Sequence, residues 1–187
     1  MSSLKQLLYS DLARQYELEG RHDVRPNFLR FLARLLHYRF LPNVLCRSSR
    51  SAMLAGIPLV PNLLTYVNLV LFGLEITPRC EIGPGVFFAH PCGVVIGARR
   101  IGSNVTIMQA VGLGAKQLDM IFDPEVRPEI GDNVILGTGC KVLGAVHVGN
   151  QATIGACAVV LDSVEPGAVM VGVPARKIGA RQLTDAI

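Results

Sequence analysis

The chain has 187 residues, a formal net charge of +4 and 50% hydrophobic residues, yet only 6% of its residues are aromatic and none is Trp. The apolar content therefore comes mainly from Val, Ile, Leu and Ala. Together with 19 Gly and 11 Pro, this favours short strands joined by turns and argues against a helical-bundle core. Five cysteines without paired spacing argue against a disulfide framework and favour a reducing cytoplasm.

The basic charge gathers in the N-terminal part of the chain. Residues 1–74 hold 9 Lys and Arg against 4 Asp and Glu, a net charge of +5, while residues 75–187 hold 9 against 10, a net charge of −1. This asymmetry predicts an acidic partner or a peripheral contact with the inner face of a membrane. The arginines are not interleaved with aromatic residues as in nucleic-acid-binding modules, so we expect no nucleic-acid partner.

Residues 1–73 are predicted to form a helical region. Ser3 and Gln6 have the spacing of a capping box, which predicts that a helix begins at Leu4. Asp11 interrupts the apolar run that a signal peptide would need, so we expect no export signal.

A second helix is predicted over residues 27–41. On it, Arg30, Arg34 and His37 form a basic stripe, which a solvated face and a contact with lipid phosphates explain equally well. Residues 51–74 carry no charge and are long enough to span a bilayer, but prolines and asparagines interrupt them. We expect a helix buried against its neighbours there, with peripheral membrane association as the alternative.

In the second half of the chain, aliphatic residues recur at every sixth position, and a small or β-branched residue lies four positions after each. The aliphatic positions are Ile76, Ile82, Phe88, Val94, then after a one-residue slip Ile101, Ile107 and Leu113, and finally Ile130, Leu136, Val142, Val148, Ile154 and Val160. A period of six fits a solenoid with three short faces per coil, over residues 74–179. Cys80, Cys92 and Cys140 occupy the small position, so we expect them to be core residues.

The repeat is interrupted by residues 114–129, called the excursion loop below. This segment is rich in charged residues and Pro, and a polar departure from a regular solenoid is where a binding loop is expected. Residues 180–187 follow the solenoid as a C-terminal tail.

The repeat resembles the hexapeptide-repeat acyltransferase superfamily, and within it the serine acetyltransferase-like branch. His90, in the segment Phe88-Ala89-His90-Pro91-Cys92-Gly93, matches the general base of that branch, and Glu75 stands fifteen residues upstream where a carboxylate orients the imidazole. The resemblance implies a mainly β fold, a left-handed parallel β-helix with an N-terminal helical region. It also implies a homotrimer, whose trimers can pair into hexamers, with acetyl-CoA as co-substrate and no metal.

The same resemblance assigns further site residues by position. Gln109 matches a substrate-binding position, and Arg176 and Lys177 lie in a segment that resembles the closing loop beside coenzyme A. Ala115, Thr138 and Ala156 align with the groove that holds the pantetheine arm and the thioester. The excursion loop is expected to reach toward the neighbouring subunit and cover the acceptor site.

Two substrate-binding positions depart from the serine acetyltransferase pattern. Ala89 replaces the Asp that binds the serine ammonium group, and Arg127 replaces a His that helps to hold its carboxylate. Residues 72–76 resemble acetyltransferases of capsule and exopolysaccharide synthesis, so a sugar hydroxyl is the acceptor that these departures favour. The terminal Ile187 supports the alternative, because serine acetyltransferases use a C-terminal Ile to dock a partner enzyme.

Two other classes of function remain open from the sequence. One is a non-catalytic hexapeptide-repeat scaffold, which acetyl-CoA binding would distinguish from an enzyme. The other is a metal enzyme of the γ-carbonic anhydrase type, which needs three His ligands. Only His90 and His147 lie in the repeat, which disfavours the metal enzyme.

Overall fold

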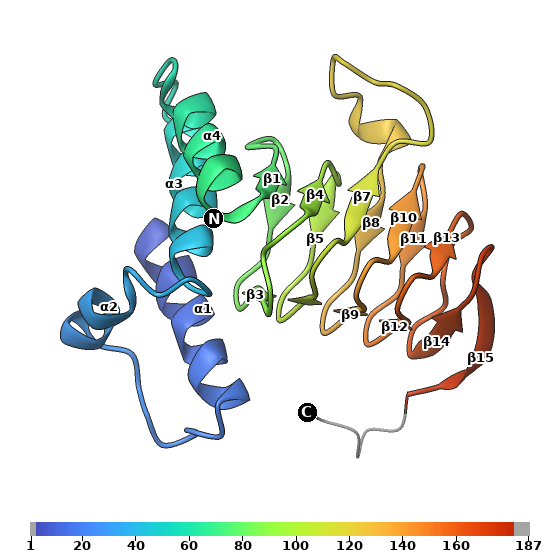
Figure 1. The fold of residues 1–187 in the computed structure, drawn as a ribbon, viewed down its shortest axis with the longest axis horizontal. Coiled ribbons are helices and arrows are strands. Elements are labelled where there is room, and N and C mark those ends of the chain that lie inside the picture. The colour runs from blue at the N-terminus through green and yellow to red at the C-terminus, as the bar shows by residue number, and fades with distance from the viewer. Residues whose placement is uncertain (1–2, 182–187) are drawn as a thin grey trace.

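The computed structural model describes residues 3–181 and has helices at one end of a three-sided solenoid (Figure 1). The helices are α1 (Leu4–Leu18), α2 (Phe28–Arg34), α3 (Leu41–Leu54) and α4 (Val60–Phe72). The predicted capping box is confirmed, because the Gln6 amide donates to Ser3 Oγ (3.3 Å) and the Ser3 amide donates to Gln6 Oε1 (2.8 Å). Within residues 3–181, no helix combines the length and the apolar content needed to cross a bilayer.

The predicted helix over residues 27–41 is too long. Asn27 caps α2 through its side chain, which accepts from the Arg30 amide (2.9 Å), but the helix ends at Arg34 and turns follow. A separate helix, α3, begins at Leu41 with Pro42 in its first turn. Proline lacks a backbone amide donor but suits the first turn of a helix, where that donor would have no intrahelical partner, so Pro42 is compatible with a helix start at Leu41.

The solenoid consists of short parallel strands arranged in three sheets. The strands are β1 (Leu74–Ile76), β2 (Glu81–Ile82), β3 (Phe87–Phe88), β4 (Val94–Ile96), β5 (Arg100–Ile101), β6 (Thr106–Ile107), β7 (Gly112–Gly114), β8 (Glu129–Ile130), β9 (Ile135–Leu136), β10 (Lys141–Leu143), β11 (His147–Val148), β12 (Thr153–Ile154), β13 (Val159–Val160), β14 (Ala168–Val171) and β15 (Arg176–Ala180). Sheet A has the order β1-β4-β7-β10-β13, sheet B β11-β8-β5-β2, and sheet C β15-β14-β12-β9-β6-β3. All pairs are parallel except the terminal β14–β15 pair. The predicted β-helix with N-terminal helices is confirmed.

The core of the solenoid is a column of apolar side chains, most of them aliphatic, stacked by strand register. In sheet C, for example, Phe88 lies beside Ile107, Ile107 beside Leu136, and Leu136 beside Ile154, each 0% exposed. The interior is narrow, so each face contributes one large side chain and one small one per coil. The six-residue period of the sequence follows from this geometry.

The corner between sheets C and A is two residues longer in the first coil than in later ones. Val94 and Cys140 are equivalent buried positions of sheet A, because each comes one residue before an aligned residue, Val95 or Lys141. Six positions separate Phe88 from Val94, whereas only four separate Leu136 from Cys140. The prediction that Cys92 is a core residue is therefore wrong: it lies on this lengthened corner and is exposed.

The two remaining cysteines predicted in the interior, Cys80 and Cys140, are confirmed as buried. Desolvation raises the pKa of the Cys140 thiol to about 12 and that of Cys80 further still. Both thiols therefore stay protonated and behave as small apolar core residues.

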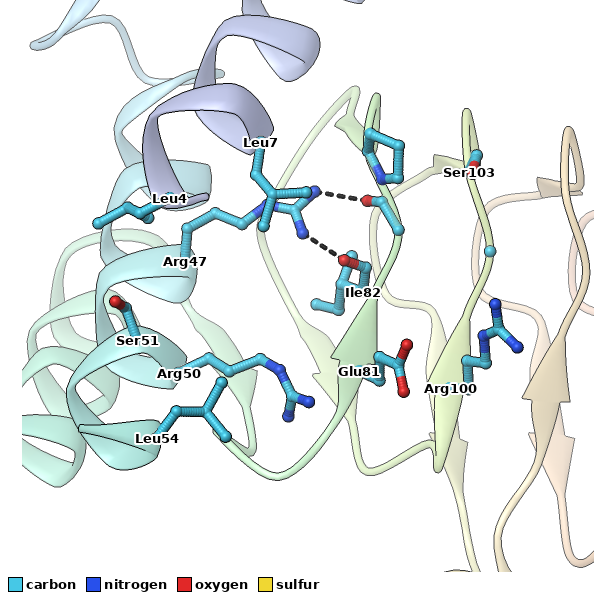
Figure 2. Close-up of a pocket in the computed structure, with 13 residues that line it drawn as sticks. Leu4, Leu7, Arg47, Arg50, Ser51, Leu54, Glu81, Ile82, Arg100 and Ser103 are labelled. Carbon is cyan, nitrogen blue, oxygen red and sulfur yellow. Dashed lines mark hydrogen bonds between the residues drawn. The ribbon is translucent and has the colours of Figure 1, made fainter. Parts of the chain in front are cut away.

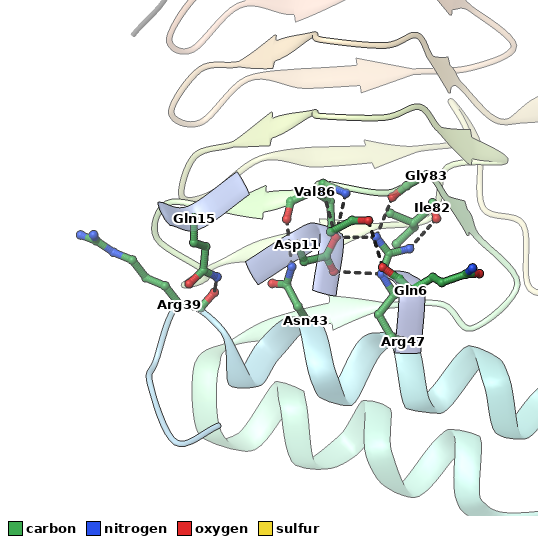
Figure 3. A network of polar contacts seen from close by, with 11 residues as sticks. Gln6, Asp11, Gln15, Arg39, Asn43, Arg47, Ile82, Gly83 and Val86 are labelled. Carbon is green, nitrogen blue, oxygen red and sulfur yellow. Dashed lines mark hydrogen bonds and ion pairs between the residues drawn. The ribbon is translucent and has the colours of Figure 1, made fainter. Parts of the chain in front are cut away.

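A buried ion pair joins the helices to the first coil (Figure 3). Arg47 of α3 donates to both carboxylate oxygens of Asp11 in α1 (2.9 and 3.1 Å), and it also donates to the carbonyl groups of Ile82 and Gly83. Asp11 in turn accepts from the Val86 amide (3.1 Å). The side chains of Arg47 and Asp11 are almost fully buried, at 3% and 0% exposure. Each charge therefore needs the other to offset the cost of its removal from water.

Breaking this pair from one side should destabilise the fold strongly. Arg47→Met would leave the Asp11 carboxylate buried without its partner, and we expect a loss of about 3–5 kcal/mol in the free energy of unfolding, measured by urea denaturation. Arg14→Met removes the exposed Arg14–Glu17 pair on the same helical end, and it should cost at most about 1 kcal/mol. Equal losses for the two variants would contradict a structural role for the buried pair.

Candidate functional site

Four predicted site residues lie at the corner between sheets C and A. His90, Gln109, Thr138 and Ala156 each come two positions after an aligned core residue of sheet C. Because the first corner is the lengthened one, Cys92 is the direct neighbour of Gln109, its carbonyl accepting from the Ala110 amide, and His90 lies two residues before Cys92. The corner is bridged by backbone hydrogen bonds between neighbouring coils, such as Gly139 to the Gln109 carbonyl and Cys157 to the Thr138 carbonyl. The strand register therefore places the predicted base, the substrate-binding Gln109 and two groove positions on a single edge.

His90 projects from this edge because its corner is the lengthened one. Its side chain is exposed, and Pro91 beside it is buried and anchors the turn. Gly93, with φ of 71°, closes the corner and donates its amide to the Gly73 carbonyl (3.0 Å) at the start of β1. The two extra residues thus place the His90 side chain outside the solenoid wall, while the backbone of the corner stays hydrogen-bonded to the preceding coil.

Glu75 lies one coil below, on the outward side of β1. It pairs with Val95 of β4 in the sheet A register and is exposed. Within residues 3–181, neither Glu75 nor His90 forms a side-chain hydrogen bond or an ion pair. Glu75 lies on the outward face of sheet A and His90 at the corner that leads into this sheet, and the orienting role expected for Glu75 remains a prediction.

Gln109 carries an unsatisfied acceptor. Among the described residues its Oε1 atom is buried and has no hydrogen-bond partner, a condition that costs about 1–3 kcal/mol when nothing else fills it. Gln109 lies at the same corner as His90, in the next coil, so this oxygen is suited to accept an N–H group from a molecule bound at that corner. The amide groups of a pantetheine arm are donors of this kind.

The excursion loop is organised by Arg127. The guanidinium donates from Nε and Nη2 to Asp119 Oδ2 (3.0 and 2.6 Å), from Nη1 to the Gly97 carbonyl (2.8 Å), and lies 4.1 Å from the Phe122 ring centroid. Although desolvation acts to raise it, hydrogen bonds from Arg127 and from loop amides lower the pKa of the Asp119 carboxyl. Most donors of Arg127 are thus engaged inside the loop, so binding an acceptor carboxylate would require it to release Asp119.

The positions predicted to contact coenzyme A are spread around the solenoid. Ala115 begins the excursion loop after β7, at the corner between sheets A and B, whereas Arg176 and Lys177 are exposed on β15. Lys177 is paired with Glu165. Arg176 donates to the Ala175 carbonyl and forms no ion pair among residues 3–181, so it is the better placed of the two to meet a phosphate.

Two cavities near the helices were not predicted from the sequence. One, of about 390 Å³, lies between α1 and sheet C and is lined by Ala89, Arg14 and Arg39 among others. Ala89 is only 9% exposed and faces this cavity. No motif indicated it, because its walls come from segments far apart in the chain.

The second cavity is a cleft of about 430 Å³ between α1, α3 and sheet B. Figure 2 shows Arg50, Glu81 and Arg100 in a row along it, while Arg47 turns toward the carbonyl groups of the first coil. None of the predicted site residues lines this cleft. Across residues 3–181, no three His, Cys, Asp or Glu side chains come together in a group that could hold a metal ion. Ile187 lies outside the described residues.

Comparison with known proteins gives consistent matches. Residues 127–162 match the family model described as bacterial transferase hexapeptide (six repeats). The chain is 44% identical over 114 residues to a serine acetyltransferase of Mycobacterium tuberculosis, covering 60% of this chain and 48% of that protein. It therefore spans about half the length of this relative, and the same holds for those of Synechococcus elongatus and Staphylococcus xylosus.

Solved structures match over nearly the whole chain. A soybean serine acetyltransferase apoenzyme superimposes with a TM-score of 0.79 at 31% identity, covering 94% of this chain and 69% of that one. A serine acetyltransferase in complex with CoA gives a TM-score of 0.80 at 27% identity, covering 94% and 70%. These matches include the N-terminal helices as well as the solenoid.

The internal bonding of the excursion loop can be tested by hydrogen exchange. Asp119→Asn removes the carboxylate that Arg127 binds, so amides of residues 115–126 should exchange several-fold faster, while the solenoid strands stay protected. Glu125→Gln is the matched control, because Glu125 lies on the same loop and pairs with Arg99 outside it, but its side chain is 72% exposed. Unchanged exchange in Asp119→Asn would show that the Arg127–Asp119 contact does not order the loop.

Proposed function

The chain belongs to the hexapeptide-repeat acyltransferase superfamily, in its serine acetyltransferase-like branch, and from that premise we propose that it is an acetyl-CoA-dependent O-acetyltransferase. The observation that carries the proposal is the exposed His90 on a lengthened corner, at the same edge of the solenoid as Gln109. A base and an unsatisfied acceptor at one corner of neighbouring coils suit a reaction between two bound substrates.

In this proposal His90 is the general base. Its neutral imidazole takes the proton of the acceptor hydroxyl as the oxygen attacks the thioester carbonyl, which forms a tetrahedral oxyanion. Collapse of that intermediate breaks the C–S bond, and the thiolate of coenzyme A takes the proton from the imidazolium. Glu75, one coil below, would hold the imidazole in the orientation that this transfer needs and stabilise its charged form.

L-serine is the acceptor that we propose. The sequence departures at Ala89 and Arg127 favoured a sugar hydroxyl, but the relatives named above are serine acetyltransferases, which supports the alternative. The prediction of polysaccharide biosynthesis has no support in these comparisons. Serine recognition in this chain must then differ in detail, because Ala89 offers no counter-ion for an ammonium group and Arg127 is bound to Asp119.

We further propose that the active unit is a homotrimer. Within one chain, His90 lies at the corner between sheets C and A, while the excursion loop leaves the solenoid at the corner between sheets A and B. Leu118, Met120 and Ile121 of the loop are 81–89% exposed, and a neighbouring solenoid would cover them. An adjacent subunit would thus bring a loop onto the His90 edge that its own chain does not supply.

Replacing the proposed base should slow turnover without preventing acetyl-CoA binding. We expect His90→Ala to lower kcat by about 10²–10⁴-fold, the usual contribution of a general base, with an unchanged Kd for acetyl-CoA by calorimetry. Glu75→Gln should reduce kcat less, because it orients the imidazole and takes no proton. His147→Ala serves as the control, since His147 is exposed on sheet B and away from the corner between sheets C and A. Full turnover in His90→Ala would remove His90 from this role.

The acceptor can be identified by comparing L-serine with nucleotide sugars in a thioester-consumption assay. We expect acetylation of L-serine and no consumption above background with the sugars. Ala89→Asp should lower the KM for L-serine by about tenfold or more, because a charge-assisted hydrogen bond to the ammonium contributes about 1.5–3 kcal/mol. Faster consumption with a nucleotide sugar than with L-serine would refute the serine proposal and leave the acetyltransferase proposal standing.

A further inference from the structure

Helix α2 presents its apolar side to solvent. Phe28, Leu29 and Leu32 lie at positions i, i+1 and i+4 of α2, which fall on one side of the helix, and Leu36 follows in the turn after Arg34. Their exposed fractions are 64%, 75%, 47% and 85%. We call these four residues the α2 face. A soluble surface helix normally turns its apolar side toward the core, so a face of this kind indicates something outside the chain that covers it.

The opposite side of α2 attaches the helix to the rest of the protein through Phe31. Its ring lies 6.0 Å from that of Tyr9 and 5.6 Å from that of Phe40, measured between centroids. No residue of α2 is buried, and within residues 3–181 no other segment packs over the α2 face. The helix is therefore held in place with its apolar side pointing outward.

The surroundings of the α2 face are basic. Residues 20–39 contain five Arg and one Asp. Arg25 and Arg30 are exposed and form no ion pair among the described residues. The predicted stripe of Arg30, Arg34 and His37 is not the surface in question, because Arg34 donates to Glu19 (2.5 Å) and lies over the Tyr16 ring.

Apolar residues flanked by exposed arginines that lack a carboxylate partner are complementary to an anionic lipid surface. Leucine and phenylalanine side chains partition into the boundary between headgroups and acyl chains, and each arginine near the surface gains attraction from anionic headgroups. A symmetric contact with a second copy of the chain is disfavoured, since it would bring the same arginines together. We propose that the α2 face docks the protein peripherally on an anionic membrane surface.

The position of α2 is compatible with this role. Figure 1 shows α2 at the outer margin of the helical end, on the side away from the solenoid. Contact through α2 would leave the His90 edge and the excursion loop free. The proposal does not depend on which reaction the solenoid catalyses, so each can fail without the other.

Vesicle sedimentation with the full-length protein tests the proposal. We expect binding to phosphatidylcholine vesicles in which about a third of the lipid is phosphatidylglycerol, and much weaker binding to phosphatidylcholine alone. High salt should weaken it by screening the arginines. Leu29→Ser with Leu36→Ser should lower the partition coefficient by about tenfold or more, and Arg25→Gln with Arg30→Gln should abolish the salt dependence.

The matched control is Leu63→Ser with Val70→Ser on α4, whose side chains are exposed to a similar degree, 59% and 62%. This control should bind vesicles as the unmodified protein does. The proposal is overturned if the unmodified protein does not bind anionic vesicles at low salt, or if the α4 control loses binding as much as the α2 variant. It is also overturned if the α2 variant has a smaller assembly mass by light scattering, because a second copy then covers the face. Unchanged helical circular dichroism excludes unfolding as the cause of lost binding.

Discussion

The narrow interior of the solenoid is the constraint on which the rest of this structure depends. Each coil can place only one large and one small side chain per face inside the column, so the sequence must repeat every six residues and the strands must stay in register. A residue at a given corner of one coil then lies directly beside its counterpart in the next. That is how His90, Gln109, Thr138 and Ala156, far apart in the chain, come to form one edge. The site is a consequence of stacking, and only its first corner departs from the repeat.

The buried Asp11–Arg47 pair attaches the helices to the first coil of the solenoid. Burying two charges is costly, and here the cost is offset by the contact between them and by backbone donors and acceptors of the first coil. Val86 takes part twice, since its amide donates to Asp11 and its carbonyl accepts from Asn43 (2.9 Å). The strand that follows, β3, leads directly into the His90 corner. The helices thus hold the stretch of backbone from which the proposed base projects.

A single chain holds the parts of the proposed site on different corners of the solenoid. Arg127 and Asp119 hold the excursion loop together, yet the apolar tip of the loop is exposed. Within residues 3–181, His90 is likewise left exposed. In the proposed trimer, the loop of one subunit would cover the His90 edge of its neighbour. Assembly therefore belongs with the proposed chemistry, and the substrate groove would be formed between chains.

The sequence by itself determined the period of the solenoid, the capped start of α1, the branch of the superfamily and the choice of His90 as the candidate base. Each of these depends on local patterns or on matching residues. It misplaced Cys92, since a two-residue lengthening of one corner shifts the frame without changing the spacing between aliphatic residues. It also extended the second helix from Arg34 to Leu41, because an apolar stripe does not show where a helix ends. Only the tertiary structure revealed the Asp11–Arg47 pair, the use of Arg127 inside its loop and the outward apolar side of α2. Each of these depends on which distant segments meet. The sequence does not distinguish a charged residue that becomes buried, or a leucine that stays uncovered, from other residues of the same type.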